Sequence, residues 1–173
     1  MIFVGNNYEQ ILVEGPDCAG KSTLINRLKN ELCFDAKSLH HRDGCQFSRY
    51  LKEYAAQTKI IFDRGHISEV VYSTLWRGGN PFNIDESTVL NSIVRLQMIT
   101  ILALPDISSL RDRYLSRAYP QKISLAELET GSHLFEDYFQ SHQMTPTIVY
   151  CSKNVEELES VVKKVSRIIL GEK

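Results

Sequence analysis

Gly15-Pro16-Asp17-Cys18-Ala19-Gly20-Lys21-Ser22-Thr23 is the stretch that decides the fold. It matches the pattern G-x-x-x-x-G-K-[ST], in which the glycines let backbone N–H groups curl around phosphate oxygens. Lys21 supplies a charge that reaches the β- and γ-phosphates, and the hydroxyl of Ser22 is a ligand for Mg²⁺. The N-terminus of a following helix favours the same anion. The stretch therefore predicts a loop that binds ATP and Mg²⁺ through the residues from Gly15 to Thr23.

The sequence on either side gives this loop the context that the motif requires. Residues 8–14 end in an apolar run and are typical of a strand. After the loop, Lys21 to Leu32 carries Leu24, Ile25 and Leu28 at helical spacing, which predicts an amphipathic helix. A turn that only resembles the motif would lack the strand before it and the helix after it.

The rest of the chain alternates between predicted strands and helices. Apolar runs predict strands at Lys59–Asp63, Met98–Leu104 and Thr147–Cys151, and a short strand is expected around Lys37–His40. Helical spacing predicts helices at 47–54, Ser68–Trp76, Asp85–Leu96, Ser108–Arg117, Leu125–Gln140 and Val155–Leu170, with Asp85 or Ser87 as the cap of the third and a turn at Tyr119-Pro120. We therefore expect one domain over 1–173, a three-layer α/β/α fold around a five-stranded parallel sheet.

Composition narrows the class of protein further. The chain has 173 residues and a net charge of -1, which argues against a protein whose main task is to coat nucleic acid. We find no apolar run long enough to span a membrane and no signal peptide, so we expect a cytoplasmic protein without a membrane partner. The four cysteines form no C-x-x-C pair, which favours free thiols over a zinc site.

Charged residues follow two further predicted strands, where the ligands of parallel sheets bind. Asp63 can hold Mg²⁺ through water or accept a proton from an attacking oxygen, and Arg64 can bind a second phosphate. Arg42, after the predicted strand at Lys37–His40, is placed to contact that same acceptor phosphate. The alternatives are a structural Asp–Arg pair and an exposed loop arginine. His40 and His41 are expected at the surface or in packing rather than in catalysis.

A second group of cations lies between residues 111 and 122. Arg113 and Arg117 are spaced i, i+4 and so are expected to share a helix face, close to Arg111 and Lys122. We expect the segment 113–124 to form a lid that closes on the transferred phosphoryl group and excludes water. The alternative is a solvated helix face. Tyr72 or Trp76 could stack on a base or belong to the core.

These residues resemble a known family, the thymidylate kinases. The stretch from Glu14 to Thr23 resembles their E-G-x-D-x-x-G-K-S/T loop, and 63–72 is similar to their D-R-x-x-x-S-x-x-A-Y segment, which deoxynucleoside kinases share in looser form. Residues 150–156 resemble the S-K-x-x-x-E stretch of the family, whose backbone holds adenine. The family has a further helix for base recognition where this chain has only about 18 residues, and the small size hints at a pared-down or viral version.

The resemblance implies the P-loop NTPase (nucleotide kinase) fold and transfer of the γ-phosphate of ATP to a deoxynucleotide with Mg²⁺. It places Asp17 and Asp63 near the acceptor sugar and phosphate and assigns Arg42 and Arg64 to that phosphate. It also puts Arg113 and Arg117 in the lid. The expected residues are then the following: Lys21, Asp17, Asp63, Arg113 and Arg117 for catalysis; Ser152, Lys153 and Asn154, with the loop and Arg113, for ATP; Arg42, Arg64 and Tyr72 for the acceptor; Ser22 and Asp63 for Mg²⁺.

Several alternatives remain at this stage. The acceptor could be a nucleoside or a hydroxymethylated base within DNA; Asp43 is the only carboxylate after the second predicted strand that could serve a nucleoside as base. A GTP-binding switch is disfavoured because the chain lacks an N/T-K-x-D motif. A non-catalytic nucleotide-binding module is the other possibility. A homodimer is also compatible with the resemblance, and Arg113, Arg117 or Lys122 could supply the catalytic cation of the lid.

Overall fold

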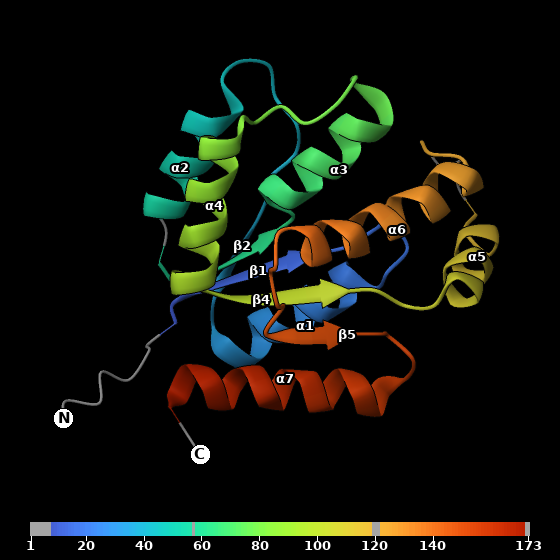
Figure 1. The fold of residues 1–173 in the computed structure, drawn as a ribbon. Helices are drawn as coiled ribbons and strands as arrows, with labels where there is room; N and C mark the ends of the chain where they lie inside the picture. Colours follow the sequence, from blue (N-terminus) through green and yellow to red (C-terminus); the bar gives the residue numbers. More distant parts are fainter. Residues whose placement is uncertain (1–7, 57, 119–121, 172–173) are drawn as a thin grey trace.

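The computed structural model describes residues 8–56, 58–118 and 122–171. Its centre is a parallel sheet with the strand order β2-β3-β1-β4-β5 (Figure 1). The strands are β1 (Gln10–Glu14), β2 (Asp35–Ser38), β3 (Ile60–Asp63), β4 (Met98–Ala103) and β5 (Ile148–Tyr150). The expected five-stranded parallel sheet is confirmed.

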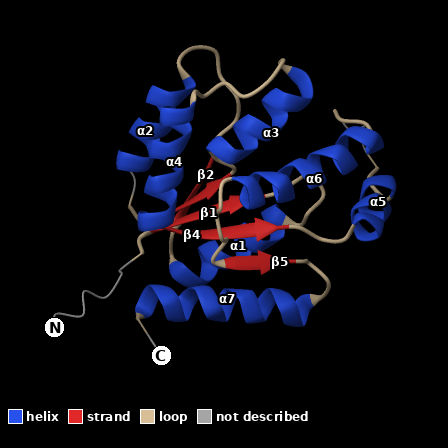
Figure 2. Cartoon of the chain, viewed as in Figure 1, coloured by secondary structure: helices blue, strands red, loops and turns tan. Residues whose placement is uncertain are grey.

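Helices cover both faces of this sheet, as Figure 2 shows. Helices α1 and α7 lie on one face, and α2, α3, α4 and α6 lie on the other (Figure 1). The helices are α1 (Lys21–Leu32), α2 (Gln46–Ala56), α3 (His66–Trp76), α4 (Ile84–Gln97), α5 (Ile107–Leu115), α6 (Leu125–Ser141) and α7 (Val155–Leu170). The three-layer α/β/α architecture is therefore confirmed. None of the described helices is both long and apolar enough to cross a membrane.

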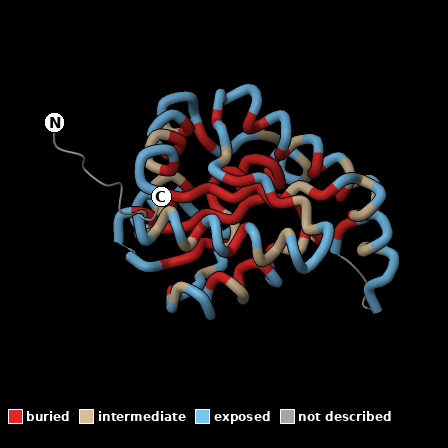
Figure 3. The backbone as a smooth tube through the Cα atoms, turned by 90° about the horizontal axis from the view of Figure 1, so that it is seen from below, coloured by how far each residue is buried: buried red, intermediate tan, exposed pale blue. Residues whose placement is uncertain are grey.

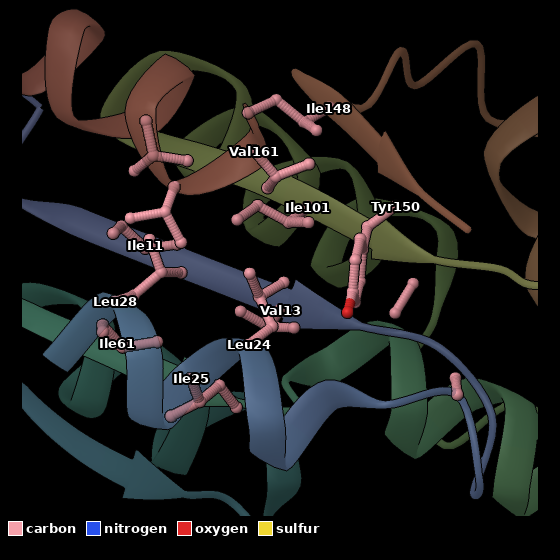
Figure 4. Packing of buried hydrophobic residues seen from close by; sticks show 14 of the residues in the cluster. Ile11, Val13, Leu24, Ile25, Leu28, Ile61, Ile101, Ile148, Tyr150 and Val161 are labelled. Carbon is pink, nitrogen blue, oxygen red and sulfur yellow. The ribbon is translucent and has the colours of Figure 1, made fainter. Parts of the chain in front are cut away.

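Alternation along the central strands divides the core in two. Ile11 and Val13 of β1 point toward α1 and α7, where they meet Leu24 and Val161 (Figure 4). Leu12, between them in sequence, points to the opposite face and belongs to the other cluster. Side chains of a strand alternate between its two faces, so a strand covered on both sides is apolar throughout. The central strands β1 and β4 are accordingly buried along their whole length, in the red centre of the backbone trace in Figure 3.

The strand order explains where a ligand can bind. β1 lies between β3 and β4, and the chain passes from one side of β1 to the other on its way from β3 to β4. At such a switch point the connections leave the strand ends in opposite directions and open a crevice. The loop from Gly15 to Gly20 starts from the end of β1 and therefore lies at this crevice.

Several predicted boundaries differ from the structure. The second strand is Asp35–Ser38, two residues earlier than expected, and α3 begins at His66 rather than Ser68. The cap of α4 is Asn83, whose side chain accepts from the backbone N–H of Glu86, so neither Asp85 nor Ser87 has that role. A turn at 119–120 lies outside the described residues.

Candidate active site

Two glycines give the phosphate-binding loop its shape. Gly15 has φ +136°, and a Cβ there would lie 2.1 Å from the carbonyl oxygen of Ala103 at the end of β4. Gly20 has φ +83°, and a Cβ there would lie 2.4 Å from Oγ of Ser152. Both backbone conformations are strained for other residues, and both spaces are filled. The loop is therefore packed against the ends of β4 and β5, where only glycine fits.

Lys21 follows the loop at the start of α1. Its side chain is buried, and Nζ donates to the carbonyl oxygens of Gly15 at 2.8 Å and Pro16 at 2.5 Å. Burial, followed by the nearby charge of Arg64, lowers the pKa of Lys21 to about 8. Gly20 caps α1 without a side-chain bond, and the first turn has no acidic residue. The loop, the first N–H groups of α1 and the Lys21 ammonium group therefore form one place that suits an anion.

A cavity of about 290 Å³, which we call the donor cavity, lies over this loop. Its walls are formed by the loop and by charged or polar side chains from three other segments, namely His40, Asp63, Arg64 and Arg117. Oδ1 of Asp63 is buried without a hydrogen-bond partner among the described residues. A carboxylate oxygen with no protein partner and the hydroxyl of Ser22 on the same cavity are the kind of oxygen ligands that Mg²⁺ takes. The residues present thus fit a magnesium ion.

A larger cavity of about 540 Å³, the acceptor cavity, adjoins the donor cavity and shares Asp17, His40 and Arg64 with it. Arg64 Nη2 donates to Oδ1 of Asp17 at 2.5 Å, and the Tyr72 hydroxyl donates to Oδ2 at 3.4 Å. The guanidinium of Arg64 lies 4.8 Å from the centre of the Tyr72 ring. These contacts fix a cation and a carboxylate at the junction of the two cavities.

Glu14, the last residue of β1, holds the first turn of α3. It is fully buried, and its carboxyl accepts from the backbone N–H of Ser68 at 3.3 Å and from the Ser68 hydroxyl. Burial raises the pKa of Glu14 to about 7, although the Ser68 bonds and the charge of Arg64 oppose this rise. Glu14 and Ser68, which belong to the two segments that resemble the kinase family, are therefore in contact and form a structural pair behind the loop.

The segment after β5 lies beside the phosphate-binding loop, with Ser152 next to Gly20. Arg113 donates from Nη1 to the carbonyl oxygen of Cys18 at 3.3 Å and from Nη2 to that of Ser152. Glu157 shapes the segment, since its carboxylate accepts from the N–H groups of Cys151 at 2.8 Å and Lys153 at 2.7 Å. Arg113 therefore joins the phosphate-binding loop to the segment that the resemblance assigns to adenine.

Most residues expected in the site come together, and two positions differ from expectation. Arg42 is exposed, lines neither the donor nor the acceptor cavity, and offers its carbonyl oxygen to Gln46. Helix α5 ends at Leu115, so Arg117 does not share a helix face with Arg113, yet it lines the donor cavity. The remaining predicted residues have the following places: Asp17 to Thr23 and Asp63 at the donor cavity, Arg64 at both cavities, Tyr72 at the acceptor cavity, Asn154 at the cap of α7, and Ser152 beside Gly20.

The segment 113–124, predicted to form a lid, is described only in part. Lys122 lines the acceptor cavity, while residues 119–121 lie outside the described part of the chain.

Sequence reasoning missed one group on the acceptor side. Glu69 of α3 is buried and binds Arg77 at 2.7 Å and His41 at 2.7 Å, and all three residues line the acceptor cavity. Ser73 also donates to Glu69, at 3.2 Å. The positions 69, 73 and 77 are spaced i, i+4, i+8, which is the signal that could have revealed a polar stripe on this helix.

The sequence and the fold of this chain can be compared with those of known proteins. No protein-family model matches the chain, and no curated protein matches it in sequence. Among solved structures, the YorR protein from Bacillus subtilis, in complex with phosphorylated GDP, has a TM-score of 0.79 at 16% identity, covering 93% of this chain and 95% of that one. Deoxyadenosine kinase from M. mycoides with bound dCTP has a TM-score of 0.60 at 16% identity, covering 91% and 98%.

Shikimate kinase from Acinetobacter baumannii in complex with shikimate is similar as well, with a TM-score of 0.58 at 13% identity, covering 96% of this chain and 95% of that one. At these identities the likeness concerns the fold. Together with the glycine loop at the end of the central strand, it shows that the chain has the α/β fold of the P-loop kinases.

Proposed function

We propose that this protein transfers the γ-phosphate of ATP to a deoxynucleoside monophosphate, dTMP or a similar nucleotide, and so forms the diphosphate. The observation that carries the proposal is the junction of the two cavities at Asp17 and Arg64. A phosphate-binding loop alone serves many proteins. A second cavity that adjoins the first provides a place for the acceptor of the transferred phosphoryl group.

The residues of the chain would act mainly by positioning and by neutralising charge. The loop amides and Lys21 would hold the β- and γ-phosphates, and Arg117 would add a cation on the same cavity. Mg²⁺, held through Ser22 and Asp63, would neutralise further phosphate charge. Arg113 would keep the loop and the segment at 151–154 together around the donor.

Arg64 supports a phosphate-bearing acceptor over a nucleoside. Its side chain is only 15% exposed and lies where the two cavities meet, so a phosphate there would receive an oriented cation. Asp43, the carboxylate considered for a nucleoside, is fully exposed and lies on neither of these two cavities. Arg42 has no part in this proposal because of its place outside both cavities.

The test is an assay of ADP release from ATP·Mg²⁺ with a panel of acceptors. The panel holds the four deoxynucleoside monophosphates, the matching nucleosides and DNA with a hydroxymethylated base. We expect release that depends on a monophosphate and disappears in the Lys21→Ala variant, which also excludes a contaminating kinase. If ADP release depends on a nucleoside or on DNA instead, that compound replaces the monophosphate as the acceptor. If no acceptor of the panel stimulates ADP release, the proposal is refuted.

A further inference from the structure

The acceptor cavity has a second junction besides the one with the donor cavity. A third cavity of about 360 Å³ shares His41, Glu69 and Arg77 with it. The donor cavity contains none of these three residues. An acceptor whose phosphate lies at Arg64 would therefore extend toward Glu69 and Arg77.

Glu69 and Arg77 present one open acceptor and one open donor at this junction. The side chain of Glu69 is only 3% exposed, and its Oε1 accepts from Arg77 Nη2, His41 Nδ1 and the Ser73 hydroxyl. Among the residues that the structure describes, the hydrogen bonds of these two side chains use Oε1 of Glu69 and Nε and Nη2 of Arg77, and none uses Oε2 of Glu69 or Nη1 of Arg77. Neither atom is among the fully buried atoms without a partner, so both are open to the cavity, and Oε2 can accept from a ligand there.

An aromatic surface lies on the same cavity. Trp76 stacks on Tyr72, with ring centres 5.0 Å apart and planes 20° apart. Its Nε1 donates to Glu127 at 2.9 Å, which fixes the orientation of the indole. Tyr72 covers the indole in part, yet Trp76 remains 44% exposed and lines the cavity. An oriented, half-exposed indole is a surface on which a nucleobase can stack.

We propose that these groups form the base-recognition site of the acceptor, an inference that rests on the proposed function. The base stacks on Trp76, while Glu69 Oε2 accepts from an N–H of the base edge and Arg77 Nη1 donates to a neighbouring carbonyl oxygen or ring nitrogen. The ligand class is a nucleobase edge that carries a donor beside an acceptor. A sugar phosphate without a base offers neither the stacking face nor this edge.

The test uses Trp76 itself, because it is the only tryptophan of the chain. Its fluorescence is followed, without ATP, during titration with each deoxynucleoside 5′-monophosphate and with deoxyribose 5-phosphate. We expect saturable quenching by nucleotides, and affinity at least about 5-fold lower for deoxyribose 5-phosphate because it lacks base stacking. Glu69→Gln is expected to lower the affinity for the preferred base by about 5- to 150-fold and to change the order of the four bases.

Glu129→Gln is the matched control, since Glu129 binds Arg111 and lies outside all three cavities. Arg77→Lys is a second variant that keeps the charge beside Glu69 but loses the forked donor, so it should also change the order of the bases. Equal affinity for deoxyribose 5-phosphate, or an unchanged order in both Glu69→Gln and Arg77→Lys, would overturn the inference. Saturable quenching by nucleotides, with an order of bases that changes in both variants but with no phosphoryl transfer, would instead refute the proposed function and leave the base site standing.

Discussion

Glu14→Gln probes the energetic cost of the carboxyl behind the phosphate-binding loop. Glu14 is fully buried, and burial raises its pKa from 4.5 to about 7 against the opposing effect of Ser68 and Arg64. A pKa rise of this size corresponds to about 3 kcal/mol of lost preference for the charged form in the folded chain. Glutamine has nearly the same shape, and its amide can both accept from the Ser68 N–H and donate to the Ser68 hydroxyl.

The sign of the pH dependence follows from the raised pKa. Below pH 4.5 the carboxyl is protonated in the folded and the unfolded chain, so its charge costs no stability. Above pH 7 it is ionised in both, and the folded chain carries the whole cost. Wild-type stability should therefore fall relative to Glu14→Gln as the pH rises, by about 2 to 3 kcal/mol between pH 5 and pH 8.

The assay is urea unfolding followed by circular dichroism at pH 5 and pH 8. The quantity of interest is the difference in unfolding free energy between wild type and Glu14→Gln, because other titrating groups cancel in it. The exposed Glu136→Gln serves as control and should show no such change with pH. A difference between wild type and Glu14→Gln that stays constant from pH 5 to pH 8 would falsify the reasoning.

Four further changes test the site. Lys21→Ala should lower ADP release by at least about 10²-fold and keep the far-ultraviolet circular dichroism of wild type; a near-normal rate contradicts the assignment. Asp63→Asn should raise the Mg²⁺ concentration needed for half-maximal rate, and an unchanged Mg²⁺ dependence argues against its metal role. Gly20→Ala should lower unfolding free energy in urea by about 1 to 3 kcal/mol, because its φ is strained and Ser152 Oγ blocks the Cβ; unchanged stability contradicts this packing. Arg113→Met should weaken ATP binding in calorimetry while acceptor binding remains, and the reverse result would remove it from the donor side.

The strand, loop and helix around Lys21 could be predicted from sequence because every local signal agrees there. The motif needs glycine at two positions, the strand before it is apolar, and α1 occupies the predicted range Lys21–Leu32. Helix α7 likewise has its predicted bounds, Val155–Leu170. In both helices apolar residues repeat at helical spacing and face the sheet, so local pattern and tertiary packing favour the same structure.

The edge of the sheet and the acceptor side could not be predicted in the same way. β2 reads Asp-Ala-Lys-Ser and has no buried residue, so periodicity has nothing to detect; backbone pairing with β3 defines it instead. Glu69 looks like an ordinary polar helix residue until His41, 28 positions away, approaches its carboxylate. Arg42 follows His41 directly in the same loop, yet its side chain is exposed to solvent, although the sequence predicted it in the site.

The double contact of Arg113 has a mechanical consequence. One guanidinium ties α5 to the main chain at Cys18 and at Ser152, two segments that are far apart in sequence. With ATP bound as proposed, an outward swing of α5 would release the contacts around its triphosphate and around its purine in one movement. Departure of spent nucleotide would then be a concerted event, with both ends of the molecule released together.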